Sequence, residues 1–118
     1  EHLMHKLAPL KLAFVHVIEG STGGARDHLP FNFDALRSIY KQGNPEGGWI
    51  VNNGYTRAMA LAAVESGHAD AVAFGKAFIS NPDLVQRLRQ DAPLADVNRA
   101  TLYGGGTQGY VDYPAMQG

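Results

Sequence analysis

Short apolar segments alternate with helical patterns along this chain, and the alternation limits the possible fold more than any other feature. Three apolar segments have the length of buried strands, and each precedes a segment whose apolar residues recur at helical spacing. The predicted strands span 12–18, 49–51 and 71–74. The predicted helices after them run from Phe33 to a stop at Gly43, over 57–66, and from Pro82 through an apolar stripe that includes Leu88. This order implies an α/β fold with parallel strands and right-handed crossovers.

Capping residues mark the ends of the predicted helices. Asn32 and Thr56 are predicted N-caps, because their side-chain oxygens can accept from the free N–H groups of a first helical turn. Gly67 is the expected stop signal of the second helix. Asn81 is the predicted cap of the third helix, with Pro82 at the first helical position.

A sheet of only three parallel strands has two open edges, which is unfavourable for a free-standing unit. We therefore predict that residues 1–118 form one domain, which is part of a (β/α)₈ TIM barrel. It contains about three β/α units and an irregular C-terminal tail from Ala92, and residues 2–7 have the pattern of a helix end. Another chain or further copies of this one are expected to complete the barrel.

Composition excludes several classes of function. The formal net charge is −1, so no basic surface is expected for nucleic acid or for an anionic membrane. The chain has no cysteine, which excludes a disulfide framework, a thiolate nucleophile and a zinc–thiolate site. Its histidines lack metal-ligand spacing, and no apolar run reaches the length of a membrane span. We expect a cytoplasmic protein without a metal site.

Two glycine-containing turns follow predicted strands, at the edge where parallel barrels bind ligands. One contains Asn53 and Gly54, and the other contains Ala73, Gly75 and Lys76. Both turns lead into helices, whose free N–H groups attract anions, and Lys76 adds a positive charge. The pattern favours a phosphate site. A glycine after a strand is also an ordinary turn residue, however, and a lysine is often only solvated, so both interpretations stay open.

Longer stretches around these turns resemble the end of the old yellow enzyme family of NADH:flavin oxidoreductases. The resemblance runs in order over nearly the whole chain. Its most specific parts are the run from Gly75 to Leu84 and the glycine-rich tail. It implies that the chain corresponds to strands 6 to 8 and the tail of an FMN-binding barrel. The matching segments are 14–20, 52–56, 70–84, 100–106, 109–110 and 112–114.

The resemblance also implies a function, in which NAD(P)H reduces FMN and the flavin passes hydride to an activated alkene, a quinone or a similar acceptor. Tyr103 matches an aromatic residue that lines the flavin and substrate pocket, although it could equally pack the core of the tail. Asn53 stands where the family has a small residue, and Lys76 replaces an arginine, which keeps the charge without the bidentate fork. The residues implied to contact the FMN phosphate are Asn53, Gly54, Ala73, Gly75 and Lys76.

The family's substrate-anchoring and proton-donating residues lie on earlier strands and have no counterpart here. No catalytic residue is therefore predicted, and the isolated chain is expected to be inactive without a complementary N-terminal barrel segment or second chain. His16 lies within an apolar strand and is expected to be a buried core residue rather than a catalyst. A non-catalytic phosphate- or nucleotide-binding module and a structural barrel fragment remain alternatives to an FMN-dependent ene-reductase.

Overall fold

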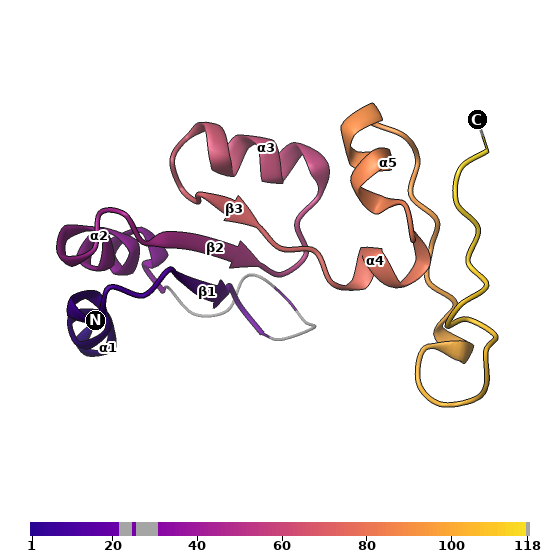
Figure 1. Ribbon diagram of the computed structural model, residues 1–118, viewed down its shortest axis with the longest axis horizontal. Coiled ribbons are helices and arrows are strands. Elements are labelled where there is room, and N and C mark those ends of the chain that lie inside the picture. Colours follow the sequence, from indigo (N-terminus) through magenta and orange to yellow (C-terminus); the bar gives the residue numbers. More distant parts are fainter. Residues whose placement is uncertain (22–24, 26–30, 118) are drawn as a thin grey trace. The chain divides into compact units, whose positions relative to one another are not determined.

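The chain folds into two units, residues 1–73 and 74–118 (Figure 1). The computed structural model describes residues 1–21, 25 and 31–117. The first unit contains α1 (His2–Leu7), η1 (Ala8–Leu10), β1 (Phe14–Ile18), α2 (Phe33–Gly43), β2 (Gly48–Asn52), α3 (Arg57–Glu65) and β3 (Ala71–Val72). The second contains α4 (Lys76–Ser80), α5 (Leu84–Gln90) and η2 (Arg99–Thr101).

The three strands form a parallel sheet in the order β1-β2-β3, which confirms the predicted connectivity. Val17 of β1 lies opposite Val51 of β2, and Val51 lies opposite Val72 of β3. The third strand is shorter than the predicted 71–74. The Ala73 N–H still donates to the Val51 oxygen at 2.9 Å, but the paired ladder ends at Val72. The described structure is thus a partial parallel sheet and not a complete barrel.

The predicted caps of α2 and α3 are confirmed. The Asn32 side chain accepts from the N–H of Ala35 at 2.9 Å, and the Thr56 hydroxyl accepts from the N–H of Met59 at 3.2 Å. Gly67 follows α3 with a φ of 78°, in the left-handed region that glycine adopts without strain. These local signals position both crossover helices, as the sequence pattern requires.

Helices cover one face of the sheet. Side chains alternate along a strand, so Trp49 and Val51 of β2 point to the same face, and both are fully buried there. Tyr40 of α2 packs on Trp49 with 5.9 Å between ring centroids. The crossovers place α2 and α3 on this face because they share one handedness. The buried cluster consists of Met4, Ala8, Tyr40, Trp49, Val51, Ala63 and Ala69.

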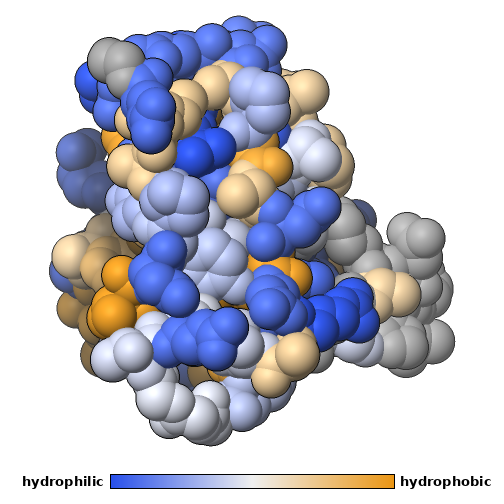
Figure 2. All heavy atoms as spheres, turned by 90° about the vertical axis from the view of Figure 1, so that its right-hand side faces the viewer, coloured by the Kyte–Doolittle hydropathy of each residue, from blue (hydrophilic) through white to orange (hydrophobic). Residues whose placement is uncertain are grey.

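The opposite face of the sheet, which we call the bare face, is not covered by any helix described in the first unit. Phe14 and Ile18 of β1 are 55% and 46% exposed, and His16 between them is exposed as well. The prediction that His16 is a buried core residue is therefore wrong for this chain, because β1 is covered only on its other side. Hydrophobic side chains also reach the surface on the face drawn in Figure 2.

The second unit departs from the predicted helix boundaries. Its longer helix, α5, begins at Leu84 with Asp83 at the N-cap, so Asn81 is not the cap and Pro82 is not the first helical residue. Asn81 instead ends the unpredicted helix α4. Its fully buried carboxamide donates to the Ala77 oxygen at 2.8 Å and accepts from the Ala95 N–H at 2.7 Å. A side chain engaged with the tail in this way cannot cap α5.

An ion pair fixes the tail to α5 within the second unit. Arg87 Nε donates to Asp83 Oδ1 at 2.8 Å, and Arg87 also donates to the Pro93 oxygen at 2.7 Å. The other oxygen of Asp83 accepts from the Met116 N–H at 2.8 Å. That backbone hydrogen bond and the one from Arg87 hold the pKa of Asp83 below its ordinary value. The irregular tail is therefore ordered by polar side chains more than by a core.

None of the helices in the described part of the chain is both long and apolar enough to cross a membrane.

The two faces of the sheet should respond differently to mutation. Trp49→Ala should lower the free energy of unfolding of the 118-residue chain by about 3–5 kcal/mol, because it leaves a cavity in the covered face. Phe14→Ala, on the bare face, should cost about 1 kcal/mol or less. Urea denaturation followed by circular dichroism measures both values. Equal losses would contradict the assignment of a covered and a bare face.

Candidate functional site

The first half of the predicted phosphate site is the turn that joins β2 to α3. Asn53 and Gly54 have φ angles of 106° and 66°, both in the left-handed region. Glycine reaches such angles freely, whereas asparagine at this φ is uncommon and strained. Asn53 is half-buried and Gly54 is exposed. The turn thus presents backbone to solvent at the carboxyl end of β2.

Hydrogen bonds compensate for the strained backbone of Asn53. Its Nδ2 donates to the oxygens of Glu19, at 2.5 Å, and of Ser21, at 3.1 Å. These bonds tie the turn to the segment that leaves β1. The backbone N–H of Asn53 donates to Oδ1 of Asn52 at 2.6 Å. One of the N–H groups implied to hold phosphate is therefore already paired with an oxygen of the neighbouring side chain.

The second half of the predicted site belongs mainly to the other unit. Gly75 is exposed, and a Cβ built there would meet no heavy atom within 4 Å. Lys76 begins α4 and is exposed. Ala73 ends the first unit, where its N–H is used by the sheet. The structure thus describes Asn53, Gly54 and Ala73 in one unit and Gly75 and Lys76 in the other, each group by itself.

Tyr103 lies in the tail and is 90% exposed. The alternative that it packs the core of the tail is therefore wrong for this chain. Its implied place beside a flavin stays a prediction. Among the described residues, no group of three or more histidine, cysteine, aspartate or glutamate side chains could hold a metal ion.

The structure also brings together four side chains that the sequence did not single out. Glu19 follows β1 directly and is buried, and Tyr55 donates its hydroxyl proton to Glu19 Oε1. His68, between α3 and β3, lies 2.9 Å from Glu19 Oε2 through Nε2 and 2.9 Å from Asp34 Oδ1 through Nδ1. We call these residues the Glu19–His68 cluster. The cluster connects the segments that follow β1 and β2 with the first turn of α2 and with the loop between α3 and β3.

The two contacts of His68 determine its protonation state. The charged form of the ring can donate from both nitrogens to these two acceptors, so the contacts favour the imidazolium. Partial burial lowers the pKa of His68, but the hydrogen bonds and charges of Glu19 and Asp34 outweigh it, and the pKa is raised above its ordinary value of 6.5. The cluster therefore stabilises the charged form of His68 between two carboxyl groups.

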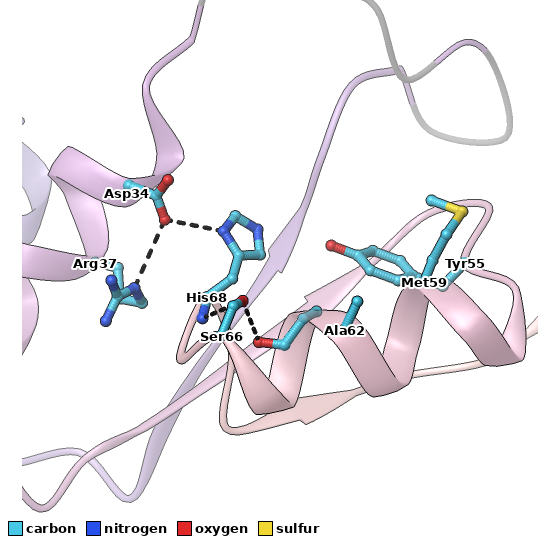
Figure 3. A pocket seen from close by; sticks show the side chains of 8 residues that line it. Asp34, Arg37, Tyr55, Met59, Ala62, Ser66 and His68 are labelled. Carbon is cyan, nitrogen blue, oxygen red and sulfur yellow. Dashed lines mark hydrogen bonds and ion pairs between the residues drawn. The ribbon is translucent and has the colours of Figure 1, made fainter.

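A groove lies beside this cluster on the helix-covered side of the first unit (Figure 3). His68 and Asp34 face each other across one end, with Arg37 next to Asp34, and Tyr55 and Met59 lie toward the start of α3. Arg37 Nε is 3.8 Å from Asp34 Oδ1. Opposite charges thus compensate one another within the groove. The remaining lining residues are Ala62, Ala63 and Ser66.

Sequence reasoning missed this cluster because its members are far apart in the chain and have no motif spacing. Only Glu19 carried a local signal, as a charged residue immediately after an apolar strand at the ligand-binding edge. The partners of the Glu19 carboxylate, Tyr55 and His68, lie 36 and 49 positions away in sequence, and Asp34 lies 34 positions from His68. Their meeting depends on how the two crossovers pack.

The imidazolium of His68 should make stability depend on pH. A raised folded-state pKa contributes stability that is fully present below the unfolded value of about 6.5 and is lost as the pH rises through the folded pKa. The wild type should therefore lose stability relative to His68→Gln as the pH rises from about 6.5 through the raised folded-state pKa, measured by urea unfolding. His2→Gln, on an exposed position of α1, is the matched control. Identical pH profiles for wild type and His68→Gln would contradict the paired imidazolium.

Relatives of known name match almost the whole chain. It is 39% identical over 114 residues to 12-oxophytodienoate reductase 7 of Oryza sativa subsp. japonica, covering 96% of this chain and 27% of the relative. It is 42% identical over 119 residues to 12-oxophytodienoate reductase 2 of Arabidopsis thaliana, covering 98% and 30%. No family model matches the chain.

Solved structures give the same result. The old yellow enzyme from Trypanosoma cruzi superposes with a TM-score of 0.84 at 35% identity, covering 98% of this chain and 29% of that one. Morphinone reductase, solved in complex with tetrahydroNAD, superposes with a TM-score of 0.79 at 36% identity, covering 98% and 30%. The homologues of this chain are therefore 12-oxophytodienoate reductases and other old yellow enzymes, and the chain spans about three tenths of their length.

Proposed function

We propose that this chain supplies the FMN phosphate-binding part of an NAD(P)H-dependent oxidoreductase of the old yellow enzyme type, which reduces an activated alkene or a quinone. The observation that carries the proposal is the turn of Asn53 and Gly54, which presents backbone at the carboxyl end of a parallel strand. Parallel α/β barrels bind phosphate at this edge. The similarity to old yellow enzymes over nearly the whole chain supports the same site.

The chemistry of the available groups fits a phosphate. Gly54 and Gly75 are exposed and have no side chain that would keep an anion from the backbone. Lys76 adds an exposed ammonium, which attracts a phosphate as a point charge. The N–H groups of Asn53 and Ala73 already donate to Asn52 and Val51, so neither fits a phosphate without a change of partner. Gly54, Gly75 and Lys76 are therefore the residues of the predicted set that suit a phosphate as they stand.

When bound, FMN would supply the hydride chemistry, as flavins do in other oxidoreductases. The residues of this chain would bind and orient the cofactor. Gly54, Gly75 and Lys76 would hold its phosphate, and the exposed ring of Tyr103 would lie along the flavin and substrate pocket. No residue of this chain is assigned a proton transfer to the substrate.

The proposal includes a complementary barrel segment, either on the same polypeptide or on a second chain. The apolar residues Phe14 and Ile18 on the bare face support it, because a closed barrel buries the corresponding face. Leu61 and Val64 of α3, each 47% exposed, support it on the helix side. The chain's similarity to only about three tenths of its homologues agrees with a missing remainder.

Lys76 tests the phosphate site. In the assembled protein, Lys76→Ala should weaken FMN binding about tenfold, which is the effect of losing one charged hydrogen bond of ~1.4 kcal/mol. Lys76→Arg is the matched control and should bind FMN at least as tightly as the wild type, because it keeps the charge and adds a fork. Fluorescence titration with FMN measures the affinities. Unchanged affinity in Lys76→Ala would exclude a phosphate contact at this residue.

Activity tests the need for a complement. The purified 118-residue chain alone should show negligible NADPH-dependent reduction of an activated alkene, because it contributes no catalytic residue. Adding the complementary segment should give a yellow, active complex. Turnover by the verified single chain would refute the requirement. A colourless complex that binds inorganic phosphate would favour the non-catalytic module, and a colourless oligomer without a ligand would favour a structural fragment.

A further inference from the structure

We infer that the side chain of Asn52 competes with the phosphate for the backbone N–H of Asn53 and thereby sets the affinity of this turn for an anion. The inference rests on the proposed function above, and it adds a residue that the resemblance does not assign to the site. The geometry that supports it is the 2.6 Å hydrogen bond from Asn53 N to Asn52 Oδ1.

Asn52 is well placed to act as an internal substitute for an anion. Its carboxamide oxygen is an acceptor with partial negative charge, and it takes the N–H that a phosphate oxygen would otherwise accept from. Asn52 is the last residue of β2. It lies two positions after Ile50, so both side chains point to the same side of the sheet, the bare face. Asn52 is half-buried. In the isolated chain, whose bare face is uncovered, its side chain therefore has room to rotate away when an anion arrives.

Asn53, in contrast, is fixed. Its carboxamide donates to the oxygens of Glu19 and Ser21, and its backbone is held at a φ of 106°. Rotation of the peptide to release its N–H would disturb these bonds. The N–H consequently keeps its direction, and an exchange of acceptor requires that Asn52 rotates away. The anion site of this turn is thus preformed at Asn53 and gated at Asn52.

The exchange has a measurable cost. A phosphate oxygen accepts a stronger, charge-assisted hydrogen bond than a carboxamide oxygen, so the phosphate can displace Asn52. The displaced hydrogen bond, from the Asn53 N–H to Asn52 Oδ1, is a neutral one. Its loss lowers the anion affinity about fivefold. Removing the Asn52 carboxamide should therefore raise the anion affinity about fivefold, although no new contact to the anion is added.

Titration with inorganic phosphate tests this directly on the full chain. The backbone amide signals of Asn53 and Gly54 are followed by ¹⁵N NMR in the wild type, in Asn52→Ala and in Asn52→Val. Both variants lack an accepting oxygen, and valine keeps a strand-forming side chain in case alanine weakens β2. Each should be half-saturated at about one fifth of the wild-type phosphate concentration.

A matched control comes from the tail. Asn98 accepts from the backbone N–H of Ala100 at 3.0 Å, in a turn unrelated to the proposed site. Asn98→Ala should therefore leave the phosphate midpoint unchanged. Equal midpoints for the wild type and both Asn52 variants would overturn the inference, as would the absence of any phosphate-dependent shift at the Asn53 amide in those variants.

The same variants, assembled with the complementary segment and titrated with FMN, separate this inference from the proposed function. Tighter FMN binding with unchanged riboflavin binding would support both, because riboflavin lacks the phosphate. Tighter binding of inorganic phosphate without FMN binding by any variant would refute the proposed function and leave the role of Asn52 in place.

Discussion

The handedness of the β-α-β crossover is the constraint on which the rest of this structure depends. Two successive right-handed crossovers between neighbouring parallel strands place both helices on one face of the sheet. That face is filled by Trp49, Val51 and Tyr40, while the side chains of Phe14 and Ile18 point to the bare face. A sheet built in this way and limited to three strands exposes apolar residues and two strand edges, so its stability in isolation is limited by its topology.

The same topology places the proposed site. Parallel strands end at a common edge, so the segment leaving β1 and the turn after β2 meet there without any special pairing between their sequences. Asn53 bonds to the backbone of Glu19 and Ser21 across this edge. A phosphate contact needs only exposed backbone and one positive charge, which a short part of a barrel can provide. Substrate binding and proton transfer need side chains from several strands, so the proposed phosphate site would not by itself perform the reaction.

Local signals were sufficient for the parts of the fold that depend on local interactions. Thr56 and Gly67 marked the limits of α3 because capping and a positive φ are properties of single residues. His16 was misjudged because burial depends on what covers a strand, and an apolar run does not reveal whether one face or both are covered. Asn81 was misjudged because its carboxamide had a distant partner, Ala95, as an alternative to a cap. The proposed phosphate residues came from the resemblance more than from their pattern, since strand-end glycines are common.

The contacts around Glu19 show why a strained asparagine can persist where glycine would fit more easily. A φ of 106° disfavours Asn53, but its side chain returns two hydrogen bonds to the segment that carries Glu19. The carboxylate of Glu19 is itself held by Tyr55 and by the imidazolium of His68. Glycine would relieve the backbone but would lose the two side-chain hydrogen bonds that tie the turn to Glu19 and Ser21. The backbone of Asn53 is therefore strained, but its side-chain hydrogen bonds fix the direction of its N–H. An anion site requires such a fixed donor.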